Sequence, residues 1–313
     1  MNTLQIISSG LLTTVQDLGR EGYGPLGVSA SGAADPVSLR IGNRLVGNAE
    51  SAAALEMTLL GGEFQFAKDT VIAATGSDFG ATLEGTEIPF CSSVVVSTGK
   101  KLRFGPTRSG ARCYLCIQGG IAVKEFLGSR STHLLSGLGG FEGRALRKGD
   151  VIPIGDTTEK FKRNTISVKA QARLVPRKIL HVTEGPQWWS FSESAKRQFL
   201  EQKYLVSEET NRMGIRLQAV PLELSSSGEM ITEGVSLGAI QIPPGGQPII
   251  LFVEQQTTGG YPKLANIIAA DLPSLGQLRP RDEIRFELIT LDAARASLLQ
   301  QERFLSSAEL IQQ

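Results

Sequence analysis

A polar stretch at residues 255–262 concentrates hydrogen-bonding groups at the end of an apolar run. It reads Gln-Gln-Thr-Thr-Gly-Gly-Tyr-Pro and follows residues 248–253, which are typical of a buried strand. The amide, hydroxyl and phenol groups can bind a polar ligand, and the two glycines let a ligand or another chain approach the backbone. Polar loops at strand ends are common binding sites. An ordinary glycine-rich hairpin loop is the alternative.

A second polar segment, residues 209–217, places Asn211, Arg212 and Arg216 around a glycine. Two neighbouring guanidinium groups suit a carboxylate or phosphate ligand, and surface salt bridges are the simpler alternative. We predict that residues 211–216 and residues 256–261 line one cleft, with arginine supplying charge and the threonine hydroxyls and glycine N–H groups supplying directed donors. Arg212→Ala and Thr258→Ala are then each expected to lower activity while leaving the melting temperature nearly unchanged.

Other motifs have structural explanations. Asp35 before Pro36 predicts a helix start, because the carboxylate caps free N–H groups and proline fits the first helical position. A ligand role for Asp35 would be additional. The loops at 105–112 and 127–133 are rich in glycine, serine and arginine and either cradle an anion or simply form turns. No phosphate-binding G-x-x-x-x-G-K-[ST] motif occurs in the sequence.

The cysteines and histidines do not suggest a metal site. Cys113 and Cys116 match C-x-x-C, but residues three apart on a strand point to opposite faces, which favours core packing. Only two histidines are present, and a Ser-His-Asp triad has no local support. Three cysteines without a signal peptide argue against a disulfide framework and predict a cytoplasmic protein.

Composition predicts a soluble, strand-rich chain of two domains. The 313 residues are 41% hydrophobic and 20% charged, and 35 of them are glycine. The net charge of +1 gives no electrostatic basis for binding nucleic acid or an anionic membrane. No apolar run approaches the roughly 20 residues of a membrane span. Short, evenly spaced apolar runs between residues 53 and 155 indicate a sandwich or barrel.

Helices are expected only at residues 36–46, at residues 192–202 and from Thr290 or Asp292 onward. A basic, polar linker is predicted at residues 156–178. The segment at 146–152 resembles that at 278–284, since in each an Asp-containing turn leads into a strand. Two halves of similar construction would explain this echo, and chance is the alternative. The predicted domains are residues 1–165 and 175–290, followed by a helical segment at 291–313.

Eight motifs together resemble the biotin-dependent carboxyltransferase family, which includes the C subunit of bacterial 5-oxoprolinase, the KipA proteins and part of urea amidolyase. In chain order, the motifs are Thr13-Thr-Val-Gln-Asp-Leu-Gly-Arg20, Leu45-Val-Gly-Asn48, Ala54-Leu-Glu56, Leu127-Gly-Ser-Arg-Ser-Thr132, Asn211-Arg-Met-Gly-Ile-Arg-Leu217, Gly238-Ala-Ile-Gln-Ile-Pro243, Gly246-Gln-Pro-Ile249 and Gln256-Thr-Thr-Gly-Gly-Tyr-Pro262. The resemblance implies a mainly β fold of two cyclophilin-like β-barrel domains with a few short helices.

The function implied by the resemblance is that of the C subunit of an ATP-dependent 5-oxoprolinase, which opens 5-oxoproline to glutamate. Implied partners are a LamB/YcsF-like A subunit together with a KipI-like B subunit, and the chain is expected to be inactive without them. ATP would be shared with these partners. The alternatives are a carboxyltransferase component acting on urea or a related amide, with biotin carried on another protein, and a non-enzymatic KipA-like regulator that binds a KipI-like kinase inhibitor.

Both reactions act on small amides and pass through oxyanions, so the resemblance implies a set of donors with nearby carboxylates. The candidate catalytic residues are Asp17, Arg212, Glu254 and Tyr261. The candidate substrate-binding residues are Arg20, Asp35, Asn211, Arg216, Gln256, Thr257, Thr258, Gly259, Gly260 and Lys263. No metal is implied.

Overall fold

The computed structural model describes residues 2–158, 161–224 and 230–312, which form two compact units. The first unit comprises Met1–Arg20, Ser31–Val175 and Leu305–Gln313, and the second comprises Glu21–Ala30 and Pro176–Phe304. In this division Glu21–Ala30 belongs to the second unit and Leu305–Gln313 to the first. The domain bounds expected from the sequence, residues 1–165, 175–290 and 291–313, stay a prediction.

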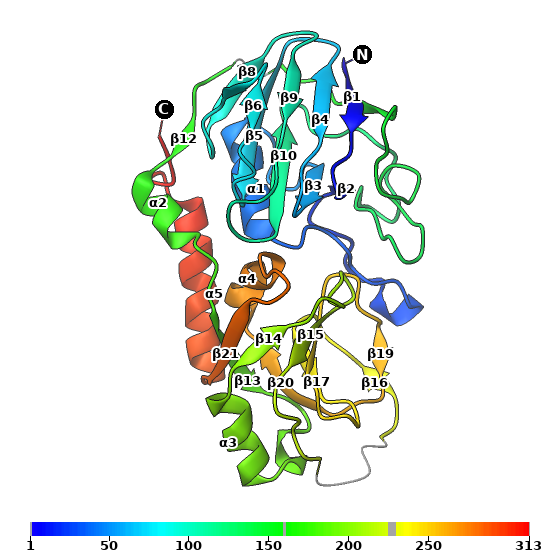
Figure 1. The fold of residues 1–313 in the computed structure, drawn as a ribbon, viewed down its shortest axis with the longest axis vertical. Coiled ribbons are helices and arrows are strands. Elements are labelled where there is room, and N and C mark those ends of the chain that lie inside the picture. Colours follow the sequence, from blue (N-terminus) through cyan, green and yellow to red (C-terminus); the bar gives the residue numbers. More distant parts are fainter. Residues whose placement is uncertain (1, 159–160, 225–229, 313) are drawn as a thin grey trace. The chain divides into compact units, whose positions relative to one another are not determined.

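The first unit consists of two antiparallel sheets (Figure 1). The larger sheet has the strand order β11-β1-β4-β9-β6-β7 and the smaller one has the order β2-β3-β10-β5-β8. The strands of the larger sheet are β1 (Asn2–Ser8), β4 (Glu63–Phe66), β6 (Thr82–Leu83), β7 (Thr86–Glu87), β9 (Lys101–Arg103) and β11 (Val151–Ile154). Those of the smaller sheet are β2 (Leu12–Gln16), β3 (Ala54–Thr58), β5 (Thr70–Gly76), β8 (Ser93–Val96) and β10 (Arg112–Ile117).

The hydrophobic core of this unit lies between its two sheets. Leu4 and Phe64 of the larger sheet and Leu55, Met57 and Leu115 of the smaller one belong to the same buried cluster. Alternate residues of each strand enter the cluster because successive side chains point to opposite faces of a sheet.

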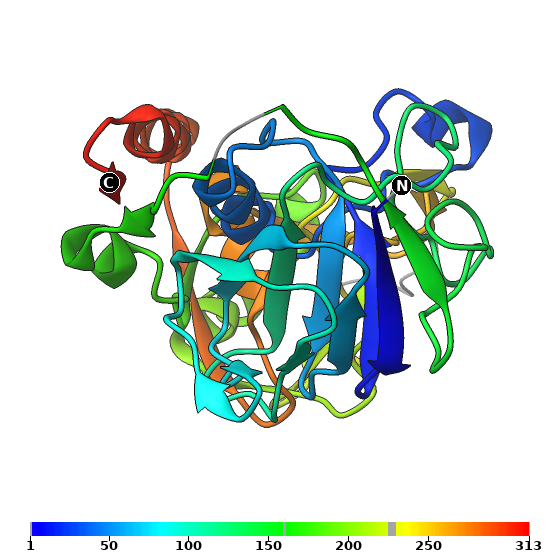
Figure 2. The ribbon, with the colours of Figure 1, turned by 90° about the horizontal axis from the view of Figure 1, so that it is seen from above.

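Helix α1 (Pro36–Leu45) packs on the outer face of the smaller sheet, against β5 and β10 (Figure 2). Asp35 caps it by accepting a hydrogen bond from the Ser38 N–H at 3.0 Å, which confirms the predicted helix start. Helix α1 and strand β10 are in close contact, because a Cβ added to Gly42 would lie 2.5 Å from the Cys116 sulfur. Cys113 instead lies in the core between the sheets, so the two cysteines face opposite sides, as predicted.

The second unit is a closed barrel with the strand order β13-β20-β17-β18-β15-β14-β21. Its strands are β13 (Ile179–Glu184), β14 (Tyr204–Val206), β15 (Gly214–Gln218), β17 (Ala239–Gln241), β18 (Ile249–Leu251), β20 (Lys263–Ile267) and β21 (Glu283–Leu288). A short ribbon outside the barrel pairs β16 (Glu233–Gly234) with β19 (Thr258–Gly259). The mainly β class is therefore confirmed, and the barrel implied by the family resemblance is present in this unit.

The helices match the prediction in three places and depart from it in two. Besides α1, α3 (Glu193–Glu201) begins after its Ser192 cap and α5 (Leu291–Ser306) lies near the C-terminus. The restriction to three helices is wrong, because α2 (Val168–Arg173) and α4 (Leu272–Gly276) also form. The predicted linker thus contains α2 and also β12 (Thr165–Ile166), which pairs with β22 (Ile311–Gln312). Single 3-10 turns occur at Gly24–Leu26, Trp188–Ser190 and Ala269–Asp271.

The sequence echo between 146–152 and 278–284 is a repeated turn. Asp150 accepts a hydrogen bond from the Arg147 N–H, and Asp282 accepts one from the Arg279 N–H, each at 2.8 Å. In each turn the residue before the aspartate has a positive φ, +94° at Gly149 and +69° at Arg281. β11 follows the first turn and β21 follows the second, so the two units share this construction.

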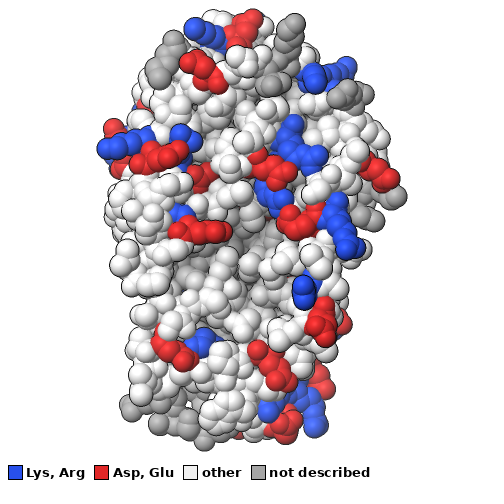
Figure 3. Space-filling view, turned by 180° about the vertical axis from the view of Figure 1, so that it is seen from behind, with Lys and Arg blue, Asp and Glu red and all other residues white. Residues whose placement is uncertain are grey.

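Acidic and basic side chains are interspersed in small groups over the face in Figure 3, in keeping with the net charge of +1. Among the described residues, no helix is long and apolar enough to cross a membrane.

Candidate functional site

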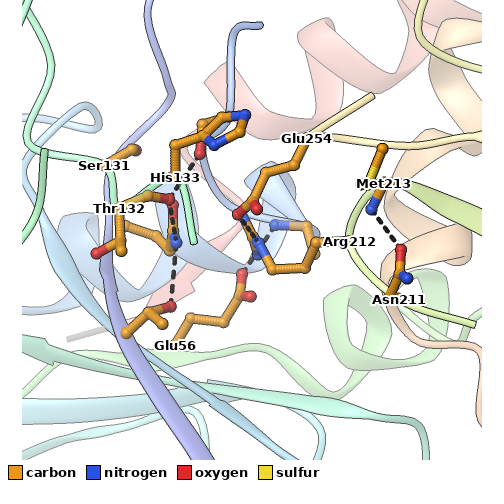
Figure 4. Close-up of polar contacts among 12 residues, drawn as sticks. Glu56, Ser131, Thr132, His133, Asn211, Arg212, Met213 and Glu254 are labelled. Atoms are coloured by element: carbon orange, nitrogen blue, oxygen red, sulfur yellow. Dashed lines mark hydrogen bonds and ion pairs between the residues drawn. The ribbon is translucent and has the colours of Figure 1, made fainter. Parts of the chain in front are cut away.

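Arg212 and Glu254 form a buried ion pair in the second unit. The Arg212 Nε–H donates to a Glu254 carboxylate oxygen, and the Glu254 N–H donates to the Arg212 carbonyl oxygen at 2.8 Å (Figure 4). Arg212 is 6% exposed and Glu254 is 3% exposed. The pair fixes the guanidinium in place. The sequence led us to expect an unchanged melting temperature for Arg212→Ala, whereas the buried pair predicts a lower one, because truncation would leave a buried carboxylate without this partner.

Asn211 and Arg216 have different surroundings from Arg212. The Asn211 side-chain oxygen accepts hydrogen bonds from the Met213 and Gly214 N–H groups and closes a turn before β15 (Figure 4). Arg216 lies at an exposed position of β15, with its Nε 3.9 Å from a Glu209 oxygen. Arg212 is therefore buried and Arg216 exposed, and whether the two guanidinium groups meet one ligand stays a prediction.

The stretch at 255–262 is ordered by pairing rather than left as an open loop. Thr258 and Gly259 form β19, and the Val235 N–H donates to the Thr257 carbonyl oxygen at 3.1 Å. Thr258 and Tyr261 are exposed, so their hydroxyl groups can reach a ligand. The Arg212 segment and this stretch are linked by the β15–β18 pairing and by the Arg212–Glu254 pair. A shared cleft remains a prediction that this linkage favours.

Lys263 is a second buried cation of the same unit. Its ammonium group donates to Glu233, and Glu233 also accepts a hydrogen bond from the Gln187 amide at 2.8 Å. The hydrogen bond from Lys263, followed by that from Gln187, lowers the pKa of the Glu233 carboxyl below its usual range. A positive charge thus lies buried within the fold, with one partly exposed carboxylate as its partner.

In the first unit, Asp17 is held by four donors. Its carboxylate accepts hydrogen bonds from the Ser129 and Ser131 hydroxyls and from the Gly19 and Arg130 N–H groups, over 2.5–2.8 Å. Three of these donors bind Oδ1 and the Arg130 N–H binds Oδ2, so a substrate proton would compete with this set for the carboxylate. The geometry makes Asp17 the organiser of the loop at 127–132, which follows it by more than a hundred residues.

Arg20 belongs to the same buried loop cluster. Its guanidinium donates to the Ser131 carbonyl oxygen and lies over the Phe126 ring, 5.7 Å from the ring centre. Thr132 continues the cluster, because its hydroxyl donates to the Val15 carbonyl oxygen at 3.0 Å. Ser131 and Thr132 appear in Figure 4 beside His133, whose Nδ1 accepts from the Ser136 N–H. Arg20 therefore stabilises the loop at 127–132 through buried contacts.

A buried network around Glu56 was missed by the sequence reasoning. The Glu56 carboxylate accepts hydrogen bonds from the Tyr114 hydroxyl and the Ala34 N–H, each at 2.8 Å, and the Arg112 Nε lies 3.5 Å away. Tyr114 in turn accepts from the Asp35 N–H at 2.7 Å, so the network holds the start of α1. Burial and then the nearby Glu56 charge raise the pKa of Tyr114 well above its usual value. A glutamate inside the apolar run 53–57 was the available signal.

Thiol and metal chemistry find no support in the described parts of the chain. Burial raises the pKa of Cys91 to about 12 and raises those of Cys113 and Cys116 as well, which disfavours a nucleophilic thiolate. Within residues 2–158, 161–224 and 230–312, no group of three or more His, Cys, Asp or Glu side chains could hold a metal ion.

Comparison with known proteins assigns the class. Residues 26–288 match the family described as "Carboxyltransferase domain, subdomain A and B", so the chain belongs to this family. It is 37% identical to the 5-oxoprolinase C subunit of Escherichia coli (strain K12), over 96% of both chains. It is 35% identical to the protein of the same name from Haemophilus influenzae, over 95% of both.

A solved structure agrees with the fold. The "Crystal Structure of the K. lactis Urea Amidolyase" superposes with a TM-score of 0.91 and 32% identity over 99% of the present chain. The chain spans only 20% of the length of that protein. The match covers 96% and 95% of the length of the two bacterial relatives but only a fifth of the length of urea amidolyase.

Proposed function

We propose that this chain is the C subunit of a multi-subunit 5-oxoprolinase that depends on ATP, and that it helps to convert 5-oxoproline to glutamate. The observation that carries the proposal is the end-to-end similarity to two proteins named as the C subunit of 5-oxoprolinase. Fold likeness alone would not separate this function from that of urea amidolyase, because one fold hosts several functions. The agreement in length with the bacterial proteins favours the 5-oxoprolinase.

Opening a lactam requires stabilisation of negative charge on the carbonyl oxygen as the ring is attacked. We assign this task to donors of the second unit: Arg212, Thr257, Thr258, Tyr261 and the N–H groups of Gly259 and Gly260. Glu254 orients the Arg212 guanidinium, so its proposed role is positioning. The exposed Asn211, Arg216 and Gln256 then contact the substrate at the edge of the site, and Lys263 supplies charge beneath it.

For Asp17, Arg20 and Asp35 we propose supporting roles. Asp17 accepts hydrogen bonds from four donors, Arg20 is buried against the loop at 127–132, and Asp35 caps α1. Proton transfer by Asp17 would require breaking hydrogen bonds that organise the loop, so we assign it the positioning of that loop.

ATP is not assigned a site on this chain. The sequence has no phosphate-binding loop, and the buried cations Arg212 and Lys263 of the second unit are each paired with a carboxylate. The described residues therefore do not fit a triphosphate held by this chain alone. We propose that ATP binds with the partner proteins, a LamB/YcsF-like A subunit together with a KipI-like B subunit.

A cytoplasmic complex fits the cysteine chemistry. All three cysteines are free and buried, which suits a reducing compartment.

The second candidate is a carboxyltransferase component acting on urea or a related small amide. It is favoured by the TM-score of 0.91 with urea amidolyase. The sequence lacks an Ala-Met-Lys-Met biotinylation motif, so biotin would arrive on another protein.

Co-purification with the proteins encoded by neighbouring genes, followed by two assays, separates these functions. Glutamate formation dependent on 5-oxoproline and ATP is expected if the main proposal is correct. Urea-dependent consumption of carboxybiotin in place of that activity would support the second candidate. A stable complex with a KipI-like protein that turns over neither substrate would point to the regulator.

A further inference from the structure

Lys263 and Gln241 lie directly opposite each other on β20 and β17 and are both buried, at 3% and 2% exposure. The Gln241 Nε2 has no hydrogen-bond partner among residues 2–158, 161–224 and 230–312. Leaving a buried amide donor unpaired costs free energy, so such groups call for an explanation. Because Gln241 is the strand partner of a buried lysine, the unpaired donor indicates a place where a negatively charged acceptor binds.

Gly259 lets two amides pack closely on the backbone at this place. A Cβ at Gly259 would lie 2.6 Å from the Gln241 Nε2 and 2.8 Å from the Gln256 Nε2, so any side chain there would displace one of the amides. Gly259 also pairs with Glu233 across the β16–β19 ribbon. Four elements therefore converge on one position: β16, β17, β19 and β20.

The Glu233 carboxylate already shows how this position recognises an anion. It accepts hydrogen bonds from the Lys263 ammonium and from the Gln187 amide. The Gln187 amide is oriented for this purpose, because its oxygen accepts from the Lys263 N–H at 3.0 Å. Yet the Glu233 side chain is 43% exposed, and it extends from a strand of two residues. A partly exposed carboxylate on a short ribbon can be exchanged for another carboxylate more readily than one locked in the core.

We propose that Lys263, Gln187, Gln241 and Gln256 form a carboxylate-binding site and that Glu233 occupies it when no ligand is bound. The ligand class is a small cyclic amide that carries a carboxylate, whose charge pairs with Lys263 after Glu233 swings away. The identification of that ligand as 5-oxoproline rests on the proposed function. Glu233 lowers the apparent affinity because it competes for the same donors, which makes binding conditional on its displacement.

Isothermal titration of the full chain with 5-oxoproline, and with 2-pyrrolidone as the ring without a carboxylate, tests the site. Glu233→Gln is expected to tighten 5-oxoproline binding several-fold, because the competing charge is removed. Lys263→Met is expected to weaken it about tenfold or more, the usual loss for a charge-assisted hydrogen bond. Lys203→Met is the matched control, since Lys203 forms an exposed pair with Glu283 elsewhere in the unit, and it should leave binding unchanged.

Gln241→Leu provides a second test if Lys263→Met impairs folding. Its Nε2 has no described partner to lose, so the variant should fold and still bind 5-oxoproline more weakly. The site is refuted if Glu233→Gln weakens binding or leaves it unchanged, if Gln241→Leu binds as well as the parent chain, or if 2-pyrrolidone binds as tightly as 5-oxoproline.

The outcome is separable from that of the proposed function. Tight, Lys263-dependent binding of 5-oxoproline to the chain, with no turnover in the reconstituted complex, would support the site and contradict the function. Full turnover whose KM for 5-oxoproline is unaffected by Lys263→Met would do the opposite.

Discussion

Arg212→Ala should strongly destabilise the second unit, because it removes one partner of a buried ion pair. Arg212 and Glu254 are 6% and 3% exposed, so water cannot replace the lost guanidinium. Breaking a buried pair from one side typically costs about 3–5 kcal/mol. At roughly 2–4 °C per kcal/mol for a domain of this size, the melting temperature should fall by about 6–20 °C.

Differential scanning calorimetry measures this effect, and two variants test its cause. Arg212→Met combined with Glu254→Leu should recover most of the loss, since replacing both charges by apolar groups is often neutral or stabilising. Arg216→Ala is the matched control, because its side chain is 52% exposed and its melting temperature should shift by no more than about 2 °C. An unchanged melting temperature for Arg212→Ala would refute the reasoning and return Arg212 to a purely functional role.

Three further predictions concern other parts of the chain. Asp17→Asn should destabilise the first unit by about 3 kcal/mol. It should also speed amide hydrogen exchange at Gly19 and Arg130, whose N–H groups donate to the Asp17 carboxylate. Unchanged exchange at both residues would contradict the loop-organising role of Asp17. Gly42→Ala should lower the free energy of unfolding, measured by chemical denaturation, by about 1–2 kcal/mol, because overpacking against the Cys116 sulfur outweighs the gain in helix propensity. Gly245→Ala is the control: a Cβ there meets open space, so the variant should be near neutral. The pKa of the Glu233 carboxyl is lowered in the folded state, so its contribution to stability is present above the ordinary pKa of 4.5 and is lost as pH falls through the folded pKa. Glu233→Gln should therefore flatten the acid side of the plot of unfolding free energy against pH. Parallel plots for the variant and the parent protein would count against the Lys263 contact.

Local sequence patterns predicted two helix starts, the faces of one strand and the repeated aspartate turn. Asp35-Pro36 and Ser192 marked two helix starts because capping chemistry acts within one turn. The Asp150 and Asp282 turns were recognisable for the same reason: an aspartate accepting from the residue three before it is a short-range interaction. Strand alternation also placed Cys113 and Cys116 on opposite faces.

The partners of the charged residues could not be predicted in this way. Glu254 is 42 residues from Arg212, and Ser129 is 112 residues from Asp17, so these pairs exist only once the sheets have formed. Sequence spacing suggested instead that Arg212 and Arg216 act together, whereas one is buried and the other is exposed. The basic composition of residues 156–178 hid α2 because polar, charged segments form short helices as readily as linkers when a Ser167 cap is available.

The most direct test of the proposed function is reconstitution with and without this chain. The chain is combined with its KipI-like and LamB/YcsF-like partners, and glutamate and ADP are measured after addition of 5-oxoproline and ATP. We predict that glutamate forms only when all the proteins are present and that the isolated chain forms none. Undiminished glutamate formation by the partners without this chain, or urea-dependent carboxyl transfer as the only activity of the assembled proteins, would contradict its assignment as the C subunit of a 5-oxoprolinase.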